Sequence, residues 1–346
     1  MSTGNDEYFM TLALAQASRG IGLTSPNPPV GAIIVKEGVV IGEGFHRKAG
    51  MPHAEIEALQ DAMGKGHDVR GSTVYVTLEP CSTQGRTPPC TDALIRSGVQ
   101  RVVYAMPDPN PAHKGSADSI LAQAGLDVES GLLFAECARM ARPFTKWITT
   151  GIPYVIAKVG QSLDGRLSRP QGEPPWITSD EAREHAMHLR MRCDAILVGA
   201  ETVRRDNPQL TLRGAEIPEE KEQPWRVVVT RSGKLPPDAH LLCDEHRERT
   251  LVLKGDMTFV DILRRISEQK ITCILLEGGG DLLGQAFAAR IVDECFWYIA
   301  PRIIGGGTMA VGGPDFVPDA RSVELMDVWH ETIGDNILVH GYPVWD

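Results

Sequence analysis

His53-Ala-Glu55 and Thr77-Leu-Glu-Pro-Cys-Ser-Thr-Gln-Gly-Arg-Thr-Pro-Pro-Cys90 are the two stretches that decide the fold of this chain. The first opens a predicted helix, and the second leads from a predicted strand through a proline-rich loop into another helix. One neutral imidazole and two thiolates form a Zn²⁺ site with a net charge near zero and a fourth position open for water. Such a site lowers the pKa of bound water toward ~7. Glu55 is placed to move protons between that water and a leaving group.

The rest of the composition is that of an ordinary globular protein. The chain has 346 residues and a formal net charge of -10, from 35 Lys plus Arg against 45 Asp plus Glu. An acidic chain argues against a nucleic-acid or anionic-membrane surface, because such binding depends on Lys and Arg. No apolar stretch approaches the ~20 residues that span a bilayer. We therefore expect no nucleic-acid partner and no membrane partner.

The seven cysteines are too few and too scattered for a disulfide framework, which favours a reducing cytoplasm. Only Cys81 and Cys90 lie among turn residues; most of the cysteines are expected to be small buried hydrophobes. His185 and His188 have i, i+3 spacing but lack a nearby third ligand, so a solvated helix face is predicted there.

Short strands and helices alternate along the chain, which predicts layered α/β domains. In the first half we expect helices at 6–19, 54–63 and 91–97, a hairpin of 30–35 with 39–41, and strands at 73–77 and 101–105. A second series follows, with strands at 154–159, 195–199, 227–230, 250–253, 273–277 and 295–300 and helices at 179–191, 258–268 and 281–289. The sequence therefore predicts two domains, residues 1–149 and 150–346.

Four motifs of the first half resemble the cytidine-deaminase superfamily: Thr24-Ser-Pro-Asn-Pro-Pro-Val-Gly31, Gly42-Glu-Gly-Phe-His46 and the two stretches quoted above. The eight-residue gap between Cys81 and Cys90 narrows this resemblance. Cytidine and tRNA-editing deaminases typically carry Cys-x-x-Cys, whereas the long Gly-Arg-Thr-Pro-Pro insertion is typical of the bifunctional riboflavin-pathway deaminase/reductases, the RibD type. The resemblance implies a three-layer domain in which His53, Cys81 and Cys90 bind one Zn²⁺ per chain and Glu55 is the proton donor. It also implies that Asn27 helps to hold the pyrimidine. Thr83 departs from the pattern, because this family usually has His at that position.

Two glycine runs in the second half are each consistent with an anion cradle or with a plain tight turn. Glu277-Gly-Gly-Gly-Asp281 follows an apolar strand and opens a helix, whose N–H groups and dipole favour an anion. Its spacing does not match the dinucleotide fingerprint G-x-G-x-x-G. Gly305-Gly-Gly307 has the same ambiguity.

Five motifs of the second half resemble the reductase domain of the same family, which is similar to dihydrofolate reductase and uses NADPH: residues 158–166, 176–179, 189–190, 199–208 and 210–213. By this resemblance the NADPH contacts are Gly160, Trp176, Thr202, Asp206 and the loop Gly279, Gly280, Asp281, Leu282, Leu283, Gly284 and Gln285. The substrate contacts implied in the same way are Lys158, Arg190, Leu210, Arg213, Glu277 and Pro174, the last standing where Ser is common. Lys and Arg suit a ribose 5-phosphate.

The predicted function is therefore two consecutive steps of riboflavin synthesis on one cytoplasmic chain. The first half would deaminate a small phosphorylated pyrimidine, and the second half would reduce its ribosyl chain with NADPH. A homo-oligomer is expected. Two alternatives remain open at this point: a nucleic-acid or nucleoside deaminase with an accessory nucleotide-binding domain, and a non-catalytic nucleotide-binding regulator that has kept the fold.

Overall fold

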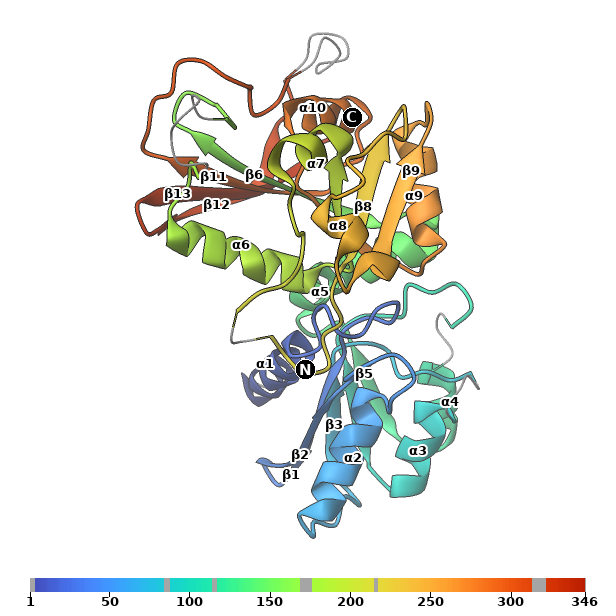
Figure 1. The fold of residues 1–346 in the computed structure, drawn as a ribbon. Coiled ribbons are helices and arrows are strands. Elements are labelled where there is room, and N and C mark those ends of the chain that lie inside the picture. The colour runs from blue at the N-terminus through green and yellow to red at the C-terminus, as the bar shows by residue number, and fades with distance from the viewer. Residues whose placement is uncertain are drawn as a thin grey trace. The chain divides into compact units, whose positions relative to one another are not determined.

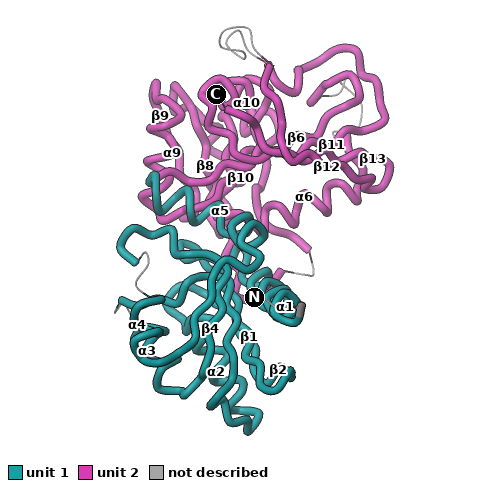
Figure 2. The backbone as a smooth tube through the Cα atoms, turned by 180° about the vertical axis from the view of Figure 1, so that it is seen from behind, with its two compact units in different colours: residues 1–151 teal, residues 152–346 magenta. Residues whose placement is uncertain are grey.

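The computed structural model of the chain describes residues 4–83, 88–113, 117–168, 176–214, 217–312 and 322–345. The chain divides into two compact units, Met1–Gly151 and Ile152–Asp346, each with its own β-sheet (Figure 2). Among the described residues, no helix is both long and apolar enough to cross a lipid bilayer.

Unit 1 is built on a five-stranded sheet with strand order β2-β1-β3-β4-β5. The strands β1 and β2 form an antiparallel hairpin, β1 pairs antiparallel with β3, and β3, β4 and β5 are parallel. The strands are β1 (Gly31–Lys36), β2 (Val39–Phe45), β3 (Thr73–Val76), β4 (Arg101–Tyr104) and β5 (Asp127–Ser130). The helices are α1 (Gly4–Ser18), α2 (Ala54–Gly64), α3 (Cys90–Ser97), α4 (Ala117–Gln123) and α5 (Phe134–Thr150).

Both faces of this sheet are covered, so unit 1 has three layers (Figure 1). Successive side chains of a strand point to opposite faces. Ile33 and Val35 of β1 therefore pack with residues of α1 and α5, while Ala32 and Ile34 pack with residues of α2, α3 and α4. This arrangement confirms the predicted three-layer α/β fold.

The glycines of the Gly42-Glu-Gly-Phe-His46 motif let helix α2 lie directly on strand β2. A Cβ on Gly42 would stand 2.4 Å from the carbonyl oxygen of Ala58, and one on Gly44 would stand 2.4 Å from its backbone nitrogen. Real Cβ atoms do not approach backbone atoms so closely. The close approach of α2 to β2 therefore sets the position of the first turn of α2, which carries Glu55.

Unit 2 is built on an eight-stranded sheet with strand order β12-β13-β11-β6-β10-β7-β8-β9. The six strands from β6 to β11 are parallel, and the β12–β13 hairpin joins the edge of β11 in the antiparallel sense. The strands are β6 (Tyr154–Ser162), β7 (Ala195–Gly199), β8 (Trp225–Thr230), β9 (Thr250–Lys254), β10 (Cys273–Leu276), β11 (Glu294–Ala300), β12 (Leu325–Ile333) and β13 (Asn336–Pro343). The helices are α6 (Asp180–Arg192), α7 (Ala200–Asp206), α8 (His240–Cys243), the 3-10 turn η1 (Arg247–Arg249), α9 (Phe259–Ser267) and α10 (Gly280–Ala288).

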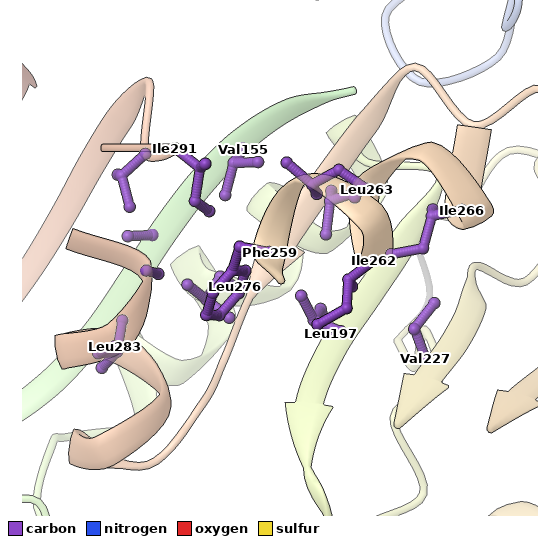
Figure 3. Packing of buried hydrophobic residues seen from close by; sticks show 14 of the residues in the cluster. Val155, Leu197, Val227, Phe259, Ile262, Leu263, Ile266, Leu276, Leu283 and Ile291 are labelled. Carbon is purple, nitrogen blue, oxygen red and sulfur yellow. The ribbon is translucent and has the colours of Figure 1, made fainter. Parts of the chain in front are cut away.

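The largest hydrophobic core of unit 2 lies between one face of the sheet and helices α9 and α10 (Figure 3). Val155, Leu197 and Leu276 come from the strands, and Leu263 and Leu283 come from the helices. Helix α6 covers part of the opposite face through Ala182, Ala186 and Leu189. The strands are thus buried on both sides, as parallel strands usually are.

The six strands predicted for the second half are all present, but the sheet has two more, β12 and β13. Strand β12 is exposed along seven of its nine residues, so it lacks the apolar alternation by which a strand is recognised. Helix α5 was also missed, because Pro143 lies inside it and a proline normally argues against a helix interior.

Candidate functional site

The residues of the first motif come together at the start of two helices in unit 1. His53 is the N-cap of α2, Glu55 lies in the first turn of that helix, and Cys90 is the first residue of α3. Cys81 comes from the loop after β3. Helix starts present unpaired N–H groups and a positive dipole end, which favour thiolates.

The three candidate metal ligands point at one another. The Nδ1 atom of His53 is 3.5 Å from the sulfur of Cys81 and 3.3 Å from the sulfur of Cys90. All three ligand atoms lie within 4.8 Å of one another. The backbone N–H of Cys90 donates to the sulfur of Cys81 at 3.3 Å, which ties the two ends of the loop together. One imidazole nitrogen and two sulfurs at this spacing are a donor set that fits Zn²⁺.

The cysteines and Glu55 of this cluster have pKa values that are shifted by one another and by burial. The hydrogen bond from the Cys90 thiol, helped by His53, lowers the pKa of Cys81 to about 4. The same bond, together with burial, raises the pKa of Cys90 well above its usual value. Burial raises the pKa of Glu55, whose side chain is only 3% exposed. A carboxyl with a raised pKa binds a proton more readily than an ordinary carboxyl, which suits a proton carrier.

Asn27 is held in one orientation by His46, a residue to which the sequence assigned no role. The carbonyl oxygen of Pro52 can only accept, so Nδ1 of His46 donates to it at 3.0 Å. The other ring nitrogen, Nε2, must then accept from the amide nitrogen of Asn27, also at 3.0 Å. The amide oxygen of Asn27 is therefore the end that is turned away from His46. Burial lowers the pKa of His46, which keeps this neutral form. The motif Gly42 to His46 contained the signal, because it ends on the histidine.

The substrate-contact candidates of unit 2 form a charged cluster. Arg190 of α6 donates from Nε and one terminal nitrogen to the two oxygens of Glu277, both at 2.8 Å, and from the other terminal nitrogen to the carbonyl of Thr211 at 3.1 Å. Burial alone would raise the pKa of Glu277, but Arg190, and after it Lys158, holds that pKa at about 2. Burial lowers the pKa of Lys158, and the negative charge of Glu277 offsets only part of that lowering.

Two further substrate-contact candidates of unit 2, Leu210 and Arg213, lie close in sequence to Thr211, whose carbonyl binds Arg190. They differ from each other in exposure. Leu210 is buried and has a positive φ of 53°. Arg213 is exposed, and its guanidinium donates to Gln209 at 3.2 Å. Pro174 lies outside the described residues.

All the candidate cofactor residues except Trp176 lie at or just beyond the carboxyl ends of three strands of the unit 2 sheet. Gly160 is near the end of β6, the run Gly278 to Gly280 follows β10, and helix α7 with Thr202 and Asp206 follows β7. These three strands are neighbours and parallel, so their carboxyl ends meet at the same edge. That edge is where α/β sheets bind ligands. Trp176 is 57% exposed and stacks with the guanidinium of Arg183 at 4.9 Å.

The residues of the candidate loop 279–285 differ in how much free space surrounds them. A Cβ on Gly279, the N-cap of α10, would meet nothing within 4 Å, so open space lies before this helix. A Cβ on Gly280 would stand 2.1 Å from the carbonyl oxygen of Met309, and one on Gly284 would stand 1.8 Å from that of Gly312. The side chain of Leu283 is fully buried in the core, so it can offer a ligand only backbone atoms. Of the three glycines in this set, Gly279 is thus the one with room beside it for a cofactor phosphate.

The second glycine run, Gly305 to Gly307, is a turn whose start is fixed by hydrogen bonds to the side chain of Asp164. The carboxylate of Asp164 accepts from the backbone N–H groups of Ile304 at 3.0 Å and Gly305 at 2.7 Å. The Ser162 hydroxyl and these two amides lower the pKa of Asp164 to about 2. The run is therefore a turn in which the Gly305 amide already binds a carboxylate and the Gly306 amide donates to the carbonyl of Ile304 at 3.0 Å.

A solvated helix face was predicted for His185 and His188. That prediction was wrong for His185 and right for His188. Nδ1 of His185 is 2.7 Å from the hydroxyl of Tyr298, a buried residue of β11, and His185 itself is only partly exposed. His188 is exposed. Spacing along the helix placed both on one face but did not show that β11 meets part of that face.

Comparison with known proteins identifies both units. A sequence model of the cytidine and deoxycytidylate deaminase zinc-binding region matches residues 3–106, and one of the RibD C-terminal domain matches residues 153–339. Fold and site therefore define a zinc-dependent deaminase domain and a reductase domain on one chain.

Curated and solved relatives match over nearly the whole length. The riboflavin biosynthesis protein RibD of Escherichia coli is 39% identical, with 97% of this chain and 98% of that protein covered. RibD of Mycobacterium tuberculosis is 41% identical, with 95% of each chain covered. The structure of Acinetobacter baumannii RibD superposes with a TM-score of 0.89 at 38% identity and covers 99% of each chain. This chain belongs to the RibD family and is a bifunctional deaminase and reductase of riboflavin biosynthesis.

Proposed function

We propose that residues 1–149 release ammonia from 2,5-diamino-6-(ribosylamino)pyrimidin-4-one 5′-phosphate with one Zn²⁺, and that residues 150–346 reduce the ribosyl chain of the product with NADPH. The observation that carries the first step is the cluster of His53, Cys81 and Cys90 beside the buried carboxyl of Glu55. The division of the chain between Gly151 and Ile152 supports the proposed domain boundary.

In the deamination, His53, Cys81 and Cys90 would hold the zinc ion. When bound, Zn²⁺ supplies a water of lowered pKa. Glu55 takes a proton from the attacking water and gives it to the departing amino group, a role that its raised pKa supports. Asn27, oriented by His46, turns its amide oxygen away from the imidazole and so can accept from an N–H of the pyrimidine.

In the reduction, Gly279 and the start of α10 would receive a phosphate of NADPH, together with Gly160, Thr202 and Asp206 at the same strand ends. Trp176 is a further proposed contact to the cofactor. The remaining loop members, Gly280, Asp281, Leu282, Leu283, Gly284 and Gln285, would support this contact mainly through the backbone of α10. NADPH supplies the hydride. The protein's own part is to orient the substrate: Lys158 and Arg213 offer cations to its phosphate, and Arg190 holds Glu277 in place. Leu210 and Pro174 are the remaining proposed substrate contacts.

The test is product identification with the purified full-length chain. Incubation with the diaminopyrimidine phosphate alone should release ammonia and replace one amino group by oxygen, as read by mass spectrometry. Addition of NADPH should then add two hydrogens to that product. A product that gains hydrogens without losing nitrogen would contradict the proposed order of the steps. Light scattering and cell fractionation check the expected homo-oligomer and the cytoplasmic location.

A further inference from the structure

The rim of the deaminase cluster carries a hydrogen bond between two loops that are far apart in sequence. Thr83 follows Cys81 by two residues, so their Cα atoms lie within about 7 Å of each other. The hydroxyl of Thr83 is 2.5 Å from Nδ1 of His113, which belongs to the loop between β4 and α4. Asp108 of the same loop interacts electrostatically with both His113 and Cys81. The imidazole of His113 therefore lies at the rim of the candidate zinc site.

The loop that carries His113 is held firmly against the metal loop. The two carboxylate oxygens of Glu79 accept from the backbone N–H groups of Asp108 at 3.1 Å and Ala117 at 3.2 Å. Asp108 in turn accepts from the N–H of Asn110 at 2.8 Å, and the N–H of His113 donates to the carbonyl of Asn110 at 3.0 Å. Glu79 precedes Cys81 by two residues, and Thr83 follows it by two. The loop of His113 is thus hydrogen-bonded to Glu79, which precedes Cys81, and to Thr83, which follows it.

We propose that His113, docked on Thr83, binds the 5′-phosphate of the deaminase substrate. The proposal rests on the proposed function, because it requires the pyrimidine to reach Glu55 and the candidate metal ligands. With the ring there, the phosphorylated ribose must extend toward the rim. Thr83 is exposed and His113 partly exposed, as a contact for an emerging group requires. A ring N–H of imidazole donates well to phosphate oxygen, and the bond to Thr83 limits the rotation of the ring.

This arrangement also accounts for the departure at position 83. The family usually has His there, and in this chain Thr83 instead binds a histidine from another loop. An imidazole is thus still present at the rim, but it comes from residue 113 and not from residue 83. Because the hydroxyl of Thr83 contacts the ring of His113, we expect a histidine restored at position 83 to reach this part of the rim.

The test compares His113→Val with the parent full-length enzyme loaded with zinc. Ammonia release is measured with the phosphorylated substrate and with its dephosphorylated counterpart. KM for the phosphorylated substrate should rise about tenfold, the usual effect of one lost charge-assisted hydrogen bond, with kcat within about twofold. KM for the dephosphorylated compound should stay within about twofold, because it has no phosphate to lose. Thr83→Val should raise KM for the phosphorylated substrate less than His113→Val does, because the imidazole remains but is no longer docked.

Three comparisons complete the experiment. His67→Ala, an exposed histidine beyond the far end of α2, should leave both KM values unchanged. Thr83→His combined with His113→Val should recover most of the lost affinity. The reductase activity of each variant should match the parent, which shows that the chain is folded.

Two results would overturn the inference: an unchanged KM for the phosphorylated substrate in His113→Val, or an equal rise for both substrates, which is what a purely structural link between loops would produce. Failure of the parent enzyme to release ammonia is a different result. It would overturn the proposed function, and this inference with it, before any substitution is made.

Discussion

The guanidinium of Arg190 is bound in a fork to the carboxylate of Glu277, with both nitrogen–oxygen distances at 2.8 Å. The two side chains are only 13% and 12% exposed. The sequence predicted each of them as a separate substrate contact. The structure shows that they first bind each other, so that removal of one leaves a charge largely buried and without its main partner.

Glu277→Gln should therefore lower the free energy of unfolding of unit 2 by about 3 kcal/mol at neutral pH. Burial raises the pKa of Glu277, but Arg190 and Lys158 together outweigh burial and lower it from 4.5 to about 2. A lowered folded-state pKa stabilises the fold above the unfolded value of 4.5 and loses that effect as the pH falls toward 2. The stability difference between parent and variant should accordingly shrink across that interval. Urea unfolding followed by tryptophan fluorescence measures this, because five of the six tryptophans lie after residue 151. Glu219→Gln, an exposed glutamate, serves as the control.

Asp164→Ala should loosen the turn at Gly305. The backbone N–H groups of Ile304 and Gly305 would lose their carboxylate acceptor and exchange faster with deuterium. Hydrogen exchange read by mass spectrometry on peptides from residues 300–309 measures this. Asp256→Ala, at an exposed position, should not change the same peptides. Unaltered exchange in Asp164→Ala would show that the turn is held by other contacts.

Gly279→Asp should weaken NADPH binding at least about tenfold without lowering the melting temperature, because the side chain enters open space but its charge repels a phosphate. Gly279→Ala controls for the added Cβ alone. Gly284→Ala, in contrast, should lower the melting temperature, since its Cβ would overlap the carbonyl oxygen of Gly312. Fluorescence titration with NADPH and thermal unfolding separate the two effects. Equal NADPH binding by Gly279→Asp and the parent would remove Gly279 from the cofactor site.

Glu55→Gln should reduce ammonia release by about 10²–10⁴-fold or more, because one carboxyl serves both proton transfers. Zinc content should not change, since Glu55 is not among the three candidate ligands. Reduction of pre-deaminated substrate should be normal, because that site is built from the other unit. A deaminase rate within a few-fold of the parent would rule out Glu55 as the proton carrier, and an equal loss of reductase activity would contradict the two-site division.

Cys81→Ser should lose the metal and the deaminase activity together, because the site would have only two strong ligands left. Elemental analysis of the purified variant measures the zinc, with about one ion per chain expected in the parent. Cys243→Ser is the matched control, since Cys243 is an exposed free cysteine outside the cluster. Full zinc occupancy in Cys81→Ser would show that the ligand assignment is wrong.

The sequence was most informative where chemistry depends on residue type and short spacing. His53 and Glu55 lie in the same helix start because they are two residues apart, and the identity of the zinc donors follows from one His and two Cys. Alternation of apolar strands and helices likewise predicted the central strands of both sheets. The exposed edge strand β12 has no such pattern, since an edge strand with solvent on both sides has no buried face to mark it.

What the sequence by itself determined is thus the set of chemical groups and the layered α/β fold, because both are encoded in neighbouring residues. Only the tertiary structure decided which of these groups meet. Asp164 is 141 residues from Gly305, Arg190 is 87 from Glu277 and Thr83 is 30 from His113, yet each pair is hydrogen-bonded. Two identical-looking glycine runs differ because the carboxylate of Asp164 binds the first amide of one, whereas open space lies beside Gly279 in the other. Such pairings arise from the packing of strands and loops onto one another, and no local pattern of residues records which partner the folded chain brings near.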